Sequence, residues 1–382
     1  MSSVQYGVRP RGKGVGWETE YFDGSDCELL AQYTEGGLCP VLLDDTLRGE
    51  NLLCRGQHCS FTVVGKLGRG SYATVWLVKD NNSPRFLALK VLTRDASKPD
   101  NDEMRVMKKL DRLLVAFFYI YKPTREKFLC LGMQPLGCTL YQRENAELRP
   151  PVDADSILIF VRTLVQKVLS YHAQGIRHGD LSPYNVTLGL HKNALLPEFL
   201  RAAFEDDQKN FVVLRGAPKS TLLPQIPAYL PIYIVTHEGH LLTDGNDMSS
   251  VEIIDFGKAF DVPSKKGTFG TKLYQPYRIA KDPEGVANEK TDLWALGCVI
   301  VFGLTDNHLF WLHDTQNSYA DMSSSEQLSV IDEYLTYNAF LGGHENLRMA
   351  VAKLIHSLIQ VDPKMRDAKK TAQLLAQLDS HL

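Results

Sequence analysis

The chain has 382 residues, which is long enough for two lobes or for one large domain with extensions. Hydrophobic residues make up 44% and charged residues 23%, a balance that excludes a wholly disordered or collagen-like chain. The 42 Lys and Arg residues are offset by 45 Asp and Glu, so the net charge of −3 provides no general basic field for nucleic acid.

The N-terminal part changes character near residue 61. Residues 1–60 hold many glycines but no long periodic element, and we interpret them as an N-terminal extension and lead-in. Over 61–90, short runs rich in Val, Leu, Thr and aromatic residues alternate with Gly-rich and Asn-Asn-Ser-Pro turns, which predicts a meander of three strands. Apolar residues recur at helical spacing over 100–114, and residues 117–132 again have the pattern of strands.

The remainder of the chain is dominated by helical patterns. A helix is predicted over 155–175, and helices prevail from residue 290 onward. Between them, residues 191–250 are irregular and rich in proline, with one short helix near the start, and we interpret them as an insertion that docks on the domain. The pattern predicts an α+β fold of two lobes: a β-rich N-lobe over 61–136 and a larger helical C-lobe over 137–382 that includes the insertion.

The first candidate site is the Gly-rich segment GRGSYATV at 68–75. Glycines let the backbone approach a ligand and direct N–H groups at phosphate oxygens. A dinucleotide-binding fingerprint needs a helix directly after the glycines, whereas residues 72–78 alternate like a strand, which disfavours it. A plain hairpin turn remains the alternative for this segment taken alone.

A lysine and a glutamate downstream favour a phosphate-binding role. Lys90 ends the apolar run Ala-Leu-Lys of the third strand, and Glu103 follows on the predicted helix. A strand lysine paired with a helix glutamate is how a phosphate-binding ammonium is held in place. Each residue alone would be an ordinary surface charge, but the two together after a Gly-rich hairpin favour the functional interpretation.

Two further segments carry oxygen ligands and a candidate base. In HGDLSPYN at 178–185, Asp180 is placed to accept a hydroxyl proton and Asn185 to bind Mg²⁺, while His178 is interpreted as a packing residue. In IIDFG at 253–257, Asp255 ends a strand and is a second candidate Mg²⁺ ligand, although Asp-x-Gly is also a common turn. Asp292 begins a very apolar helix and is interpreted as an anchor for backbone donors of the 178–185 loop.

This ordered set of motifs resembles a protein kinase from about residue 31 to 375. The segments YTEGGLCP (33–40), KLGRGSYATVWL (66–77) and FLCLGMQPLG (128–137), together with the position of the insertion, are similar to the compact fungal SR-protein kinases. The resemblance implies a two-lobed kinase fold, the cofactors ATP and Mg²⁺, and transfer of the γ-phosphate to Ser or Thr of a protein. The catalytic group is then Asp180, Lys90 and Glu103, with Asn185 and Asp255 as metal ligands. The implied nucleotide-binding residues are Leu67, Gly68, Gly70, Ser71, Val75, Ala88, Lys90, Met133, Gln134 and Leu136.

Three positions depart from the family pattern. Most Ser/Thr kinases have a lysine two residues after the base, where this chain has Ser182, as RIO-type kinases do. Gly179 replaces the usual catalytic-loop arginine, which argues against switching by phosphorylation of the activation loop. Arg278 stands where kinases have a glutamate that pairs with an arginine near the C-terminus, here Arg366. We therefore predict that Arg366 pairs with one of three other carboxylates: Asp282, Glu284 or Glu289.

Two alternative functions stay open at this point. Ser182 and Arg278 also fit a pseudokinase, a scaffold that binds nucleotide or partners without turnover. The segments HGDL and IIDFG also fit a small-molecule phosphotransferase of the aminoglycoside or choline type. Against the latter stand the Asp-x-Trp helix start, the hinge segment and the Gly-rich hairpin.

The partners follow from the same resemblance. It implies a protein substrate, of the Arg/Ser-rich class, and a monomer. A set of acidic residues is a candidate docking surface for such substrates, with an ordinary solvated face as the alternative: Asp306, Asp314, Asp321, Glu326, Asp332 and Glu333. No apolar run approaches ~18–20 residues and the N-terminus lacks a secretory signal, so we expect no membrane partner. The net charge of −3 provides no general basic field, so we expect no direct nucleic-acid partner. Seven scattered cysteines indicate reduced thiols, so we expect a cytoplasmic location, with the nucleus as a further compartment.

Overall fold

The computed structural model divides the chain into two compact units, each described by itself. The first unit comprises residues 1–135 and 192–242, and the second comprises residues 136–191 and 243–382. The structure describes residues 8–10, 17–19, 28–143, 150–151, 153–204, 211–213, 229–231, 233–235, 241–244, 248–266, 270–276, 286–310 and 313–378.

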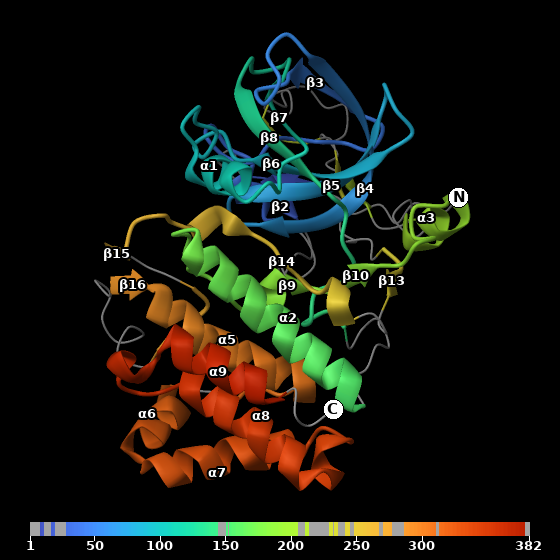
Figure 1. Cartoon of the computed structure of the whole chain (residues 1–382). Helices are drawn as coiled ribbons and strands as arrows, with labels where there is room; N and C mark the ends of the chain where they lie inside the picture. The colour runs from blue at the N-terminus through green and yellow to red at the C-terminus, as the bar shows by residue number, and fades with distance from the viewer. Residues whose placement is uncertain are drawn as a thin grey trace. The chain divides into compact units, whose positions relative to one another are not determined.

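The first unit is built on an antiparallel sheet of six described strands in the order β3-β4-β5-β6-β8-β7 (Figure 1). The strands run along short stretches of β-branched and aromatic residues, as the sequence predicts for 61–90 and 117–132. Their bounds are β3 (Thr46–Glu50), β4 (His58–Gly70), β5 (Ala73–Asp80), β6 (Phe86–Leu92), β7 (Val115–Ile120) and β8 (Lys127–Met133).

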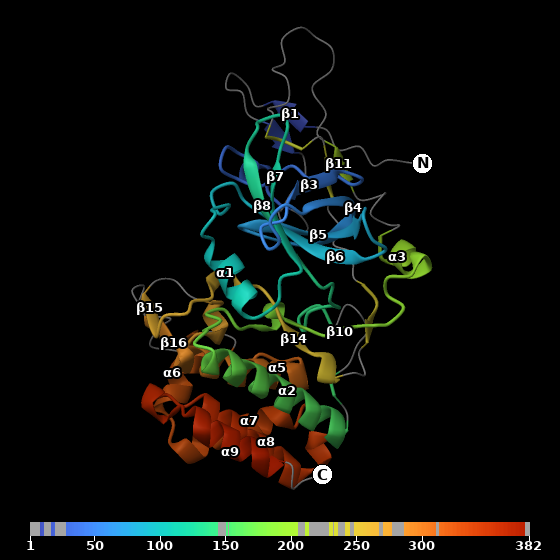
Figure 2. The ribbon, with the colours of Figure 1, turned by 45° about the horizontal axis from the view of Figure 1, so that its top comes forward.

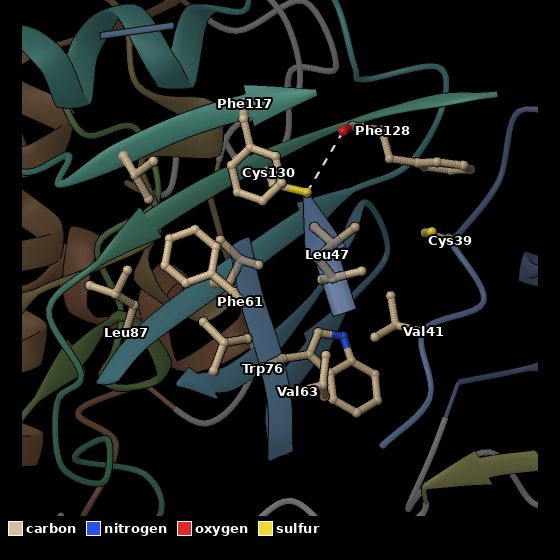
Figure 3. Close-up of a cluster of buried hydrophobic side chains, with 14 of the residues drawn as sticks. Cys39, Val41, Leu47, Phe61, Val63, Trp76, Leu87, Phe117, Phe128 and Cys130 are labelled. Atoms are coloured by element: carbon tan, nitrogen blue, oxygen red, sulfur yellow. Dashed lines mark hydrogen bonds between the residues drawn. The ribbon is translucent and has the colours of Figure 1, made fainter. Parts of the chain in front are cut away.

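One face of this sheet holds the core of the unit. Because side chains alternate along a strand, every second residue of β5, β6 and β8 points to this face. Figure 3 shows side chains of this cluster, among them Phe61 of β4 and Phe117 of β7, whose rings stack at a centroid distance of 5.7 Å. Cys39 and Val41, from the N-terminal extension, are buried in the same cluster. The extension is therefore part of the core, and it also supplies strand β3.

The helix predicted over 100–114 is shorter in the structure. Helix α1 (Asp102–Lys109) begins after Asn101, whose side chain accepts a hydrogen bond from the Met104 amide. It ends because Asp111 takes a left-handed backbone with φ of 54°. Leu114 already donates its amide to Gly132 of the sheet, so apolar spacing alone overestimated the helix at its C-terminal end.

The insertion groups with the first unit, whereas the sequence placed it in the larger lobe. Its described elements are helix α3 (Pro197–Phe204) and the paired strands β11 (Phe211–Val213) and β12 (Tyr233–Val235). Val235 is buried in the main core cluster, and Ile234 packs with Tyr33 and Leu38 of the extension. The N-terminal extension and the insertion, far apart in sequence, thus meet on the first unit.

The second unit is mainly helical (Figure 2). Helix α2 (Ala154–Ala173) begins at the cap Asp153 and agrees with the helix predicted over 155–175. Helix α5 (Glu289–Thr305) is buried along almost its whole length and packs against α2 and α8. The other helices are α6 (His313–Asp321), α7 (Ser324–Leu335), α8 (Glu345–Leu358) and α9 (Ala368–Leu378).

The remaining strands are short and pair in twos. They are β9 (Val186–Thr187) with β14 (Glu252–Ile253), β10 (Gly189–Leu190) with β13 (Thr243–Asp244), β15 (Ser264–Lys266) with β16 (Val286–Asn288), and β1 (Val8–Pro10) with β2 (Trp17–Thr19). A sheet-based unit and a helical unit together confirm the α+β class. Among the described helices, none combines the length and the hydropathy needed to cross a membrane.

Candidate active site

Lys90 and Glu103 form an ion pair in the first unit. The Nζ atom of Lys90, on β6, lies 2.6 Å from Oε1 of Glu103, on α1. Their side chains are 12% and 6% exposed, so the pair is screened from bulk water but still reachable. The strand lysine and the helix glutamate thus pair as the sequence predicted.

Lys90 points to the sheet face opposite the core cluster. Val75 is its direct cross-strand neighbour, and Ala88 lies on the same face two residues earlier along β6. Ala88 in turn faces Met133 on β8. The register therefore brings these four predicted nucleotide-binding residues onto one surface.

The Gly-rich hairpin joins β4 to β5. Gly68 pairs with Val75, and Gly70 pairs with Ala73 at the tip, where Ser71 is exposed. A Cβ built on Gly68 would meet nothing within 4 Å among the described residues, and one on Gly70 would meet only the Ala73 carbonyl, at 4.0 Å. Neither glycine has a positive φ. The fold itself does not require these glycines, and their open side is what a hairpin covering phosphates needs.

The other three predicted nucleotide-binding residues occupy different settings. Leu67 is half-buried in β4, next to a register shift between Lys66 and Gly68. Gln134 is exposed directly after β8, while the half-buried Leu136 is the first residue of the second unit.

In the second unit, the loop before β9 is fixed by Asp292 near the start of α5. The Asp292 carboxylate accepts hydrogen bonds from the backbone amides of His178, at 2.7 Å, and Gly179, at 2.9 Å, and lies 3.0 Å from Nε2 of His172. Burial by itself would raise the pKa of Asp292, but these hydrogen bonds outweigh burial and hold the pKa below its ordinary value. The prediction that Asp292 anchors backbone donors of this loop is confirmed.

His178 has a packing role, as the sequence indicated. Its Nε2 lies 2.9 Å from the carbonyl of Ile254, and its Nδ1 accepts the Asp180 amide at 3.2 Å. With Nδ1 accepting from a backbone amide, Nε2 is the ring nitrogen that faces the Ile254 carbonyl as a donor. The ring also packs edge-on against Phe256 at a centroid distance of 5.1 Å.

Asn185 and Asp255 lie at the same end of the β9–β14 pair. The ladder joins Val186 to Ile253, and the Ile254 amide then donates to the Asn185 carbonyl at 2.9 Å. The Asn185 side chain donates its amide hydrogen to the Asp180 carbonyl at 2.8 Å, which turns its Oδ1 away from this bond. Asp255 follows with φ of 61°, a strained backbone for an aspartate. Hard oxygen donors from a carboxylate and an amide, held at one strand end, fit Mg²⁺.

Asp180 has two neighbours that the sequence reasoning missed. Its Oδ1 accepts a hydrogen bond from the Thr271 hydroxyl at 3.4 Å, and its Oδ2 lies 3.4 Å from Nζ of Lys258. Lys258 follows the Asp-Phe-Gly segment directly, so a charged residue at that point of the motif was the available signal. Nothing in the sequence indicates Thr271.

The structure gives a steric reason for Gly179. Its φ is 75°, and a Cβ there would lie 2.7 Å from the Lys258 carbonyl. The bridge between Arg177 and Phe260, with reciprocal backbone hydrogen bonds of 2.9 and 3.0 Å, holds the two segments at this close approach. Any side chain in place of Gly179 would force the loop away from the segment that carries Lys258.

Among the described residues, Arg366 forms no ion pair with the carboxylates predicted for it. Arg366 is buried and donates to the carbonyls of Gln360, Lys290 and Val361, with its guanidinium 4.9 Å from the centre of the Trp294 ring. Burial lowers its pKa to about 10. Glu289 pairs with Arg177 at 3.4 Å instead, while Asp282, Glu284 and Arg278 lie outside the described residues. Carbonyl dipoles and an aromatic face stabilise this buried cation.

Comparison with known proteins decides the family. The protein kinase domain model matches residues 61–210 and 238–377, about three quarters of the chain. The chain belongs to the protein kinase family. It is 22% identical to the serine/threonine-protein kinase AFC3 of Arabidopsis thaliana, over 85% of this chain and 72% of that protein. It is also 22% identical to AFC1 of the same plant, over 69% of this chain and 51% of AFC1.

A further relative is a probable serine/threonine-protein kinase of Dictyostelium discoideum. The two are 23% identical over 64% of this chain, and the match covers only 20% of the Dictyostelium protein. The chain therefore matches a fifth of one relative, half of another and less than three quarters of the third.

Proposed function

We propose that this kinase is an active, ATP-dependent serine/threonine protein kinase of the SR-protein kinase type. Family membership and the Ser/Thr kinase relatives support the general class. The observation that carries the activity is the setting of Asp180, whose carboxylate is partly exposed in a loop held by Asp292 and whose backbone is bound to Asn185. A base must be fixed in place and still reach its substrate, and this carboxylate meets both conditions.

Each group of residues has a distinct role in the proposal. Lys90, oriented by Glu103, binds the α- and β-phosphates, and the backbone of Gly68, Gly70 and Ser71 covers the phosphates. The apolar sheet face of Val75, Ala88 and Met133 would hold the adenine. Leu67, Gln134 and Leu136 are the other residues proposed for nucleotide binding.

Asp180 accepts the proton of the substrate hydroxyl while the hydroxyl oxygen attacks the γ-phosphorus. The new O–P bond forms while the bond to the β-phosphate oxygen breaks, and the leaving electron pair stays on that oxygen. Asn185 and Asp255 supply the oxygen ligands for Mg²⁺. When bound, Mg²⁺ neutralises charge on the β- and γ-phosphates.

The substrate class is proposed from the resemblance to SR-protein kinases, which act on Arg/Ser-rich proteins. Two members of the acidic set considered for docking are engaged in internal pairs, Asp306 with Arg143 and Asp332 with Arg348. Asp321 and Glu326 are exposed. The substrate therefore has at most part of that set available.

The proposal is tested by phosphate transfer from ATP with Mg²⁺ to an Arg-Ser repeat peptide and to a generic basic protein. We expect turnover with the wild type and a 10²–10⁴-fold fall in kcat for Asp180→Asn, because the base is lost. The matched control is Asp155→Asn, an exposed aspartate in the first turn of α2, which should retain wild-type turnover. Equal transfer by the wild type and Asp180→Asn would leave the pseudokinase interpretation. Transfer to choline or an aminoglycoside but to neither protein would favour the small-molecule phosphotransferase.

A further inference from the structure

Ser182 does not reach the surface of the candidate active site. Its side chain is fully buried, and its hydroxyl has no hydrogen-bond partner among the described residues. A hydroxyl enclosed in this way cannot contact a phosphoryl group outside the fold. The position two residues after the base therefore contributes no charge and no donor to phosphate transfer.

A different residue brings a positive charge to the same base. Lys258 is 40% exposed at its side chain, and its Nζ lies 3.4 Å from Oδ2 of Asp180, which is 14% exposed. The distance exceeds that of the Lys90–Glu103 pair by 0.8 Å (3.4 against 2.6 Å), so the ammonium is loosely paired and keeps hydrogens for another acceptor.

The backbone fixes the segment from which Lys258 extends. The reciprocal hydrogen bonds between Arg177 and Phe260 clamp it to the loop of Asp180, and Gly179 permits the close approach of the Lys258 carbonyl. Asp255 caps the turn through a bond from the Gly257 amide at 3.3 Å. The backbone before and after Lys258 is therefore fixed, and this holds Lys258 beside Asp180.

We propose that Lys258 is a catalytic residue that contacts the transferring γ-phosphoryl group and supplies the charge that Ser182 does not. A substrate hydroxyl that is hydrogen-bonded to Asp180 must lie about 3–3.5 Å from the phosphorus that it attacks. The Lys258 ammonium lies beside the same carboxylate, so it can reach the oxygens of that phosphoryl group. The proposed role of Lys258 is electrostatic, and no proton is transferred to or from it. This inference rests on the proposed kinase function for its kinetic part.

The kinetic test compares Lys258→Met, Lys258→Arg and Ser182→Ala in the full chain. Loss of one preorganised donor should lower kcat about 10²–10³-fold in Lys258→Met. Lys258→Arg should stay within about tenfold of the wild type because it keeps the charge. Ser182→Ala should stay within about threefold. The matched control is Lys167→Met, which breaks the 2.8 Å pair with Glu252 in the same unit and should leave kcat unchanged.

A binding measurement separates this inference from the proposed function. Lys258→Met should reduce the preference for Mg-ATP over Mg-ADP at least threefold, because only ATP carries the γ-phosphate. The same reduction should appear in an Asp180→Asn background, where a lysine that merely oriented Asp180 would have no further effect.

The outcomes decide between the two ideas. In an active wild type, a kcat for Lys258→Met within twofold, or a large loss in Ser182→Ala, overturns the role of Lys258. In a wild type that binds nucleotide without turnover, the proposed function fails, and the ATP preference alone decides: a reduced preference supports Lys258, and an unchanged one overturns it. A chain that binds no nucleotide overturns both.

Discussion

Lys66 and Gly68 stand two residues apart in β4, yet they lie in opposite kinds of surroundings. Lys66 is 1% exposed and pairs with the equally buried Glu28 at 2.6 Å, while also donating to the Val235 carbonyl at 2.9 Å. Gly68 has open space where a side chain would be. The extension and the insertion bury the side chain at position 66. Two residues later along the same strand, no described residue lies within 4 Å of where a Cβ at position 68 would be.

Some charged side chains of this protein stabilise the fold, and others remain accessible to a ligand. The Lys66–Glu28 pair joins β4 to the extension, and Val235 brings in the insertion. Lys90 and Glu103 have the same 2.6 Å distance but remain partly exposed. The second unit repeats the pattern, with Asp292 buried and Asp180 partly exposed. Burial, not pairing distance, distinguishes the two kinds of ion pair.

The largest effect on stability is expected from breaking the buried pair. Lys66→Met leaves the Glu28 carboxylate buried without its cation, which should lower the free energy of unfolding by about 3–5 kcal/mol. Lys90→Met should cost about 1–2 kcal/mol and lower nucleotide affinity at least tenfold. Denaturant unfolding and nucleotide titration check both variants. If the two lost stability equally, the contrast between the pairs would be wrong. The double variant Lys66→Met, Glu28→Met should recover more than half of the loss.

A second prediction asks whether Asp292 belongs with the buried, structural charges. In Asp292→Asn the new amide group faces backbone donors, so we expect about 2–4 kcal/mol of lost stability from two charge-assisted hydrogen bonds. Because the folded-state pKa is depressed, the contribution of Asp292 is fully present above its unfolded-state pKa and is lost as pH falls through the folded value.

Unfolding measured from pH 7 to below 3.8 checks this sign. The stability gap between the wild type and Asp292→Asn should narrow below pH 3.8, and it should stay constant between pH 5 and 7. A gap that widens on acidification would contradict the assignment of the low pKa to Asp292.

The smallest effect sharpens the contrast within β4 itself. A Cβ on Gly65 would overlap the ring of Phe204 from α3, so Gly65→Ala should cost about 1–3 kcal/mol, and Phe204→Ala should relieve much of that cost. Gly68→Ala should change stability by less than about 1 kcal/mol but weaken nucleotide binding, because the added methyl group occupies the open side. Thermal unfolding and nucleotide titration of the two alanine variants distinguish these effects. A destabilised Gly68→Ala would show that the hairpin is closed by the fold.

Much of the fold was predictable because its signals are local. Alternation marked the strands of 61–90, and helical spacing marked α2. The helix over 100–114 was overestimated because Asp111 turns the chain, and nothing in apolar spacing reports a left-handed residue. The insertion groups with the other unit, since its docking depends on Val235 meeting Lys66, 169 positions away, and on Phe204 meeting Gly65, 139 positions away.

The candidate site divides in the same way. The sequence predicted the Lys90–Glu103 pair and the backbone donors bound by Asp292. Each of these motifs indicates both the residue type and the strand, helix or loop on which it lies. For Arg366 only the Glu289 alternative is excluded, because Glu289 pairs with Arg177, while Asp282 and Glu284 lie outside the described residues. Among the described residues, the buried guanidinium bonds to carbonyls and lies over a ring, contacts that no local motif indicates. Thr271 and Lys258 were missed because their meeting with Asp180 joins segments separated by 78 to 91 residues.

The sequence by itself determined the family, the α+β class and the residue types offered to phosphate and Mg²⁺, since these depend on short motifs and their order along the chain. Only the tertiary structure decided which charges are buried and which remain within reach of a ligand. Burial depends on what distant segments cover, and so the same lysine–carboxylate chemistry becomes a structural link at Lys66 and a candidate binding group at Lys90.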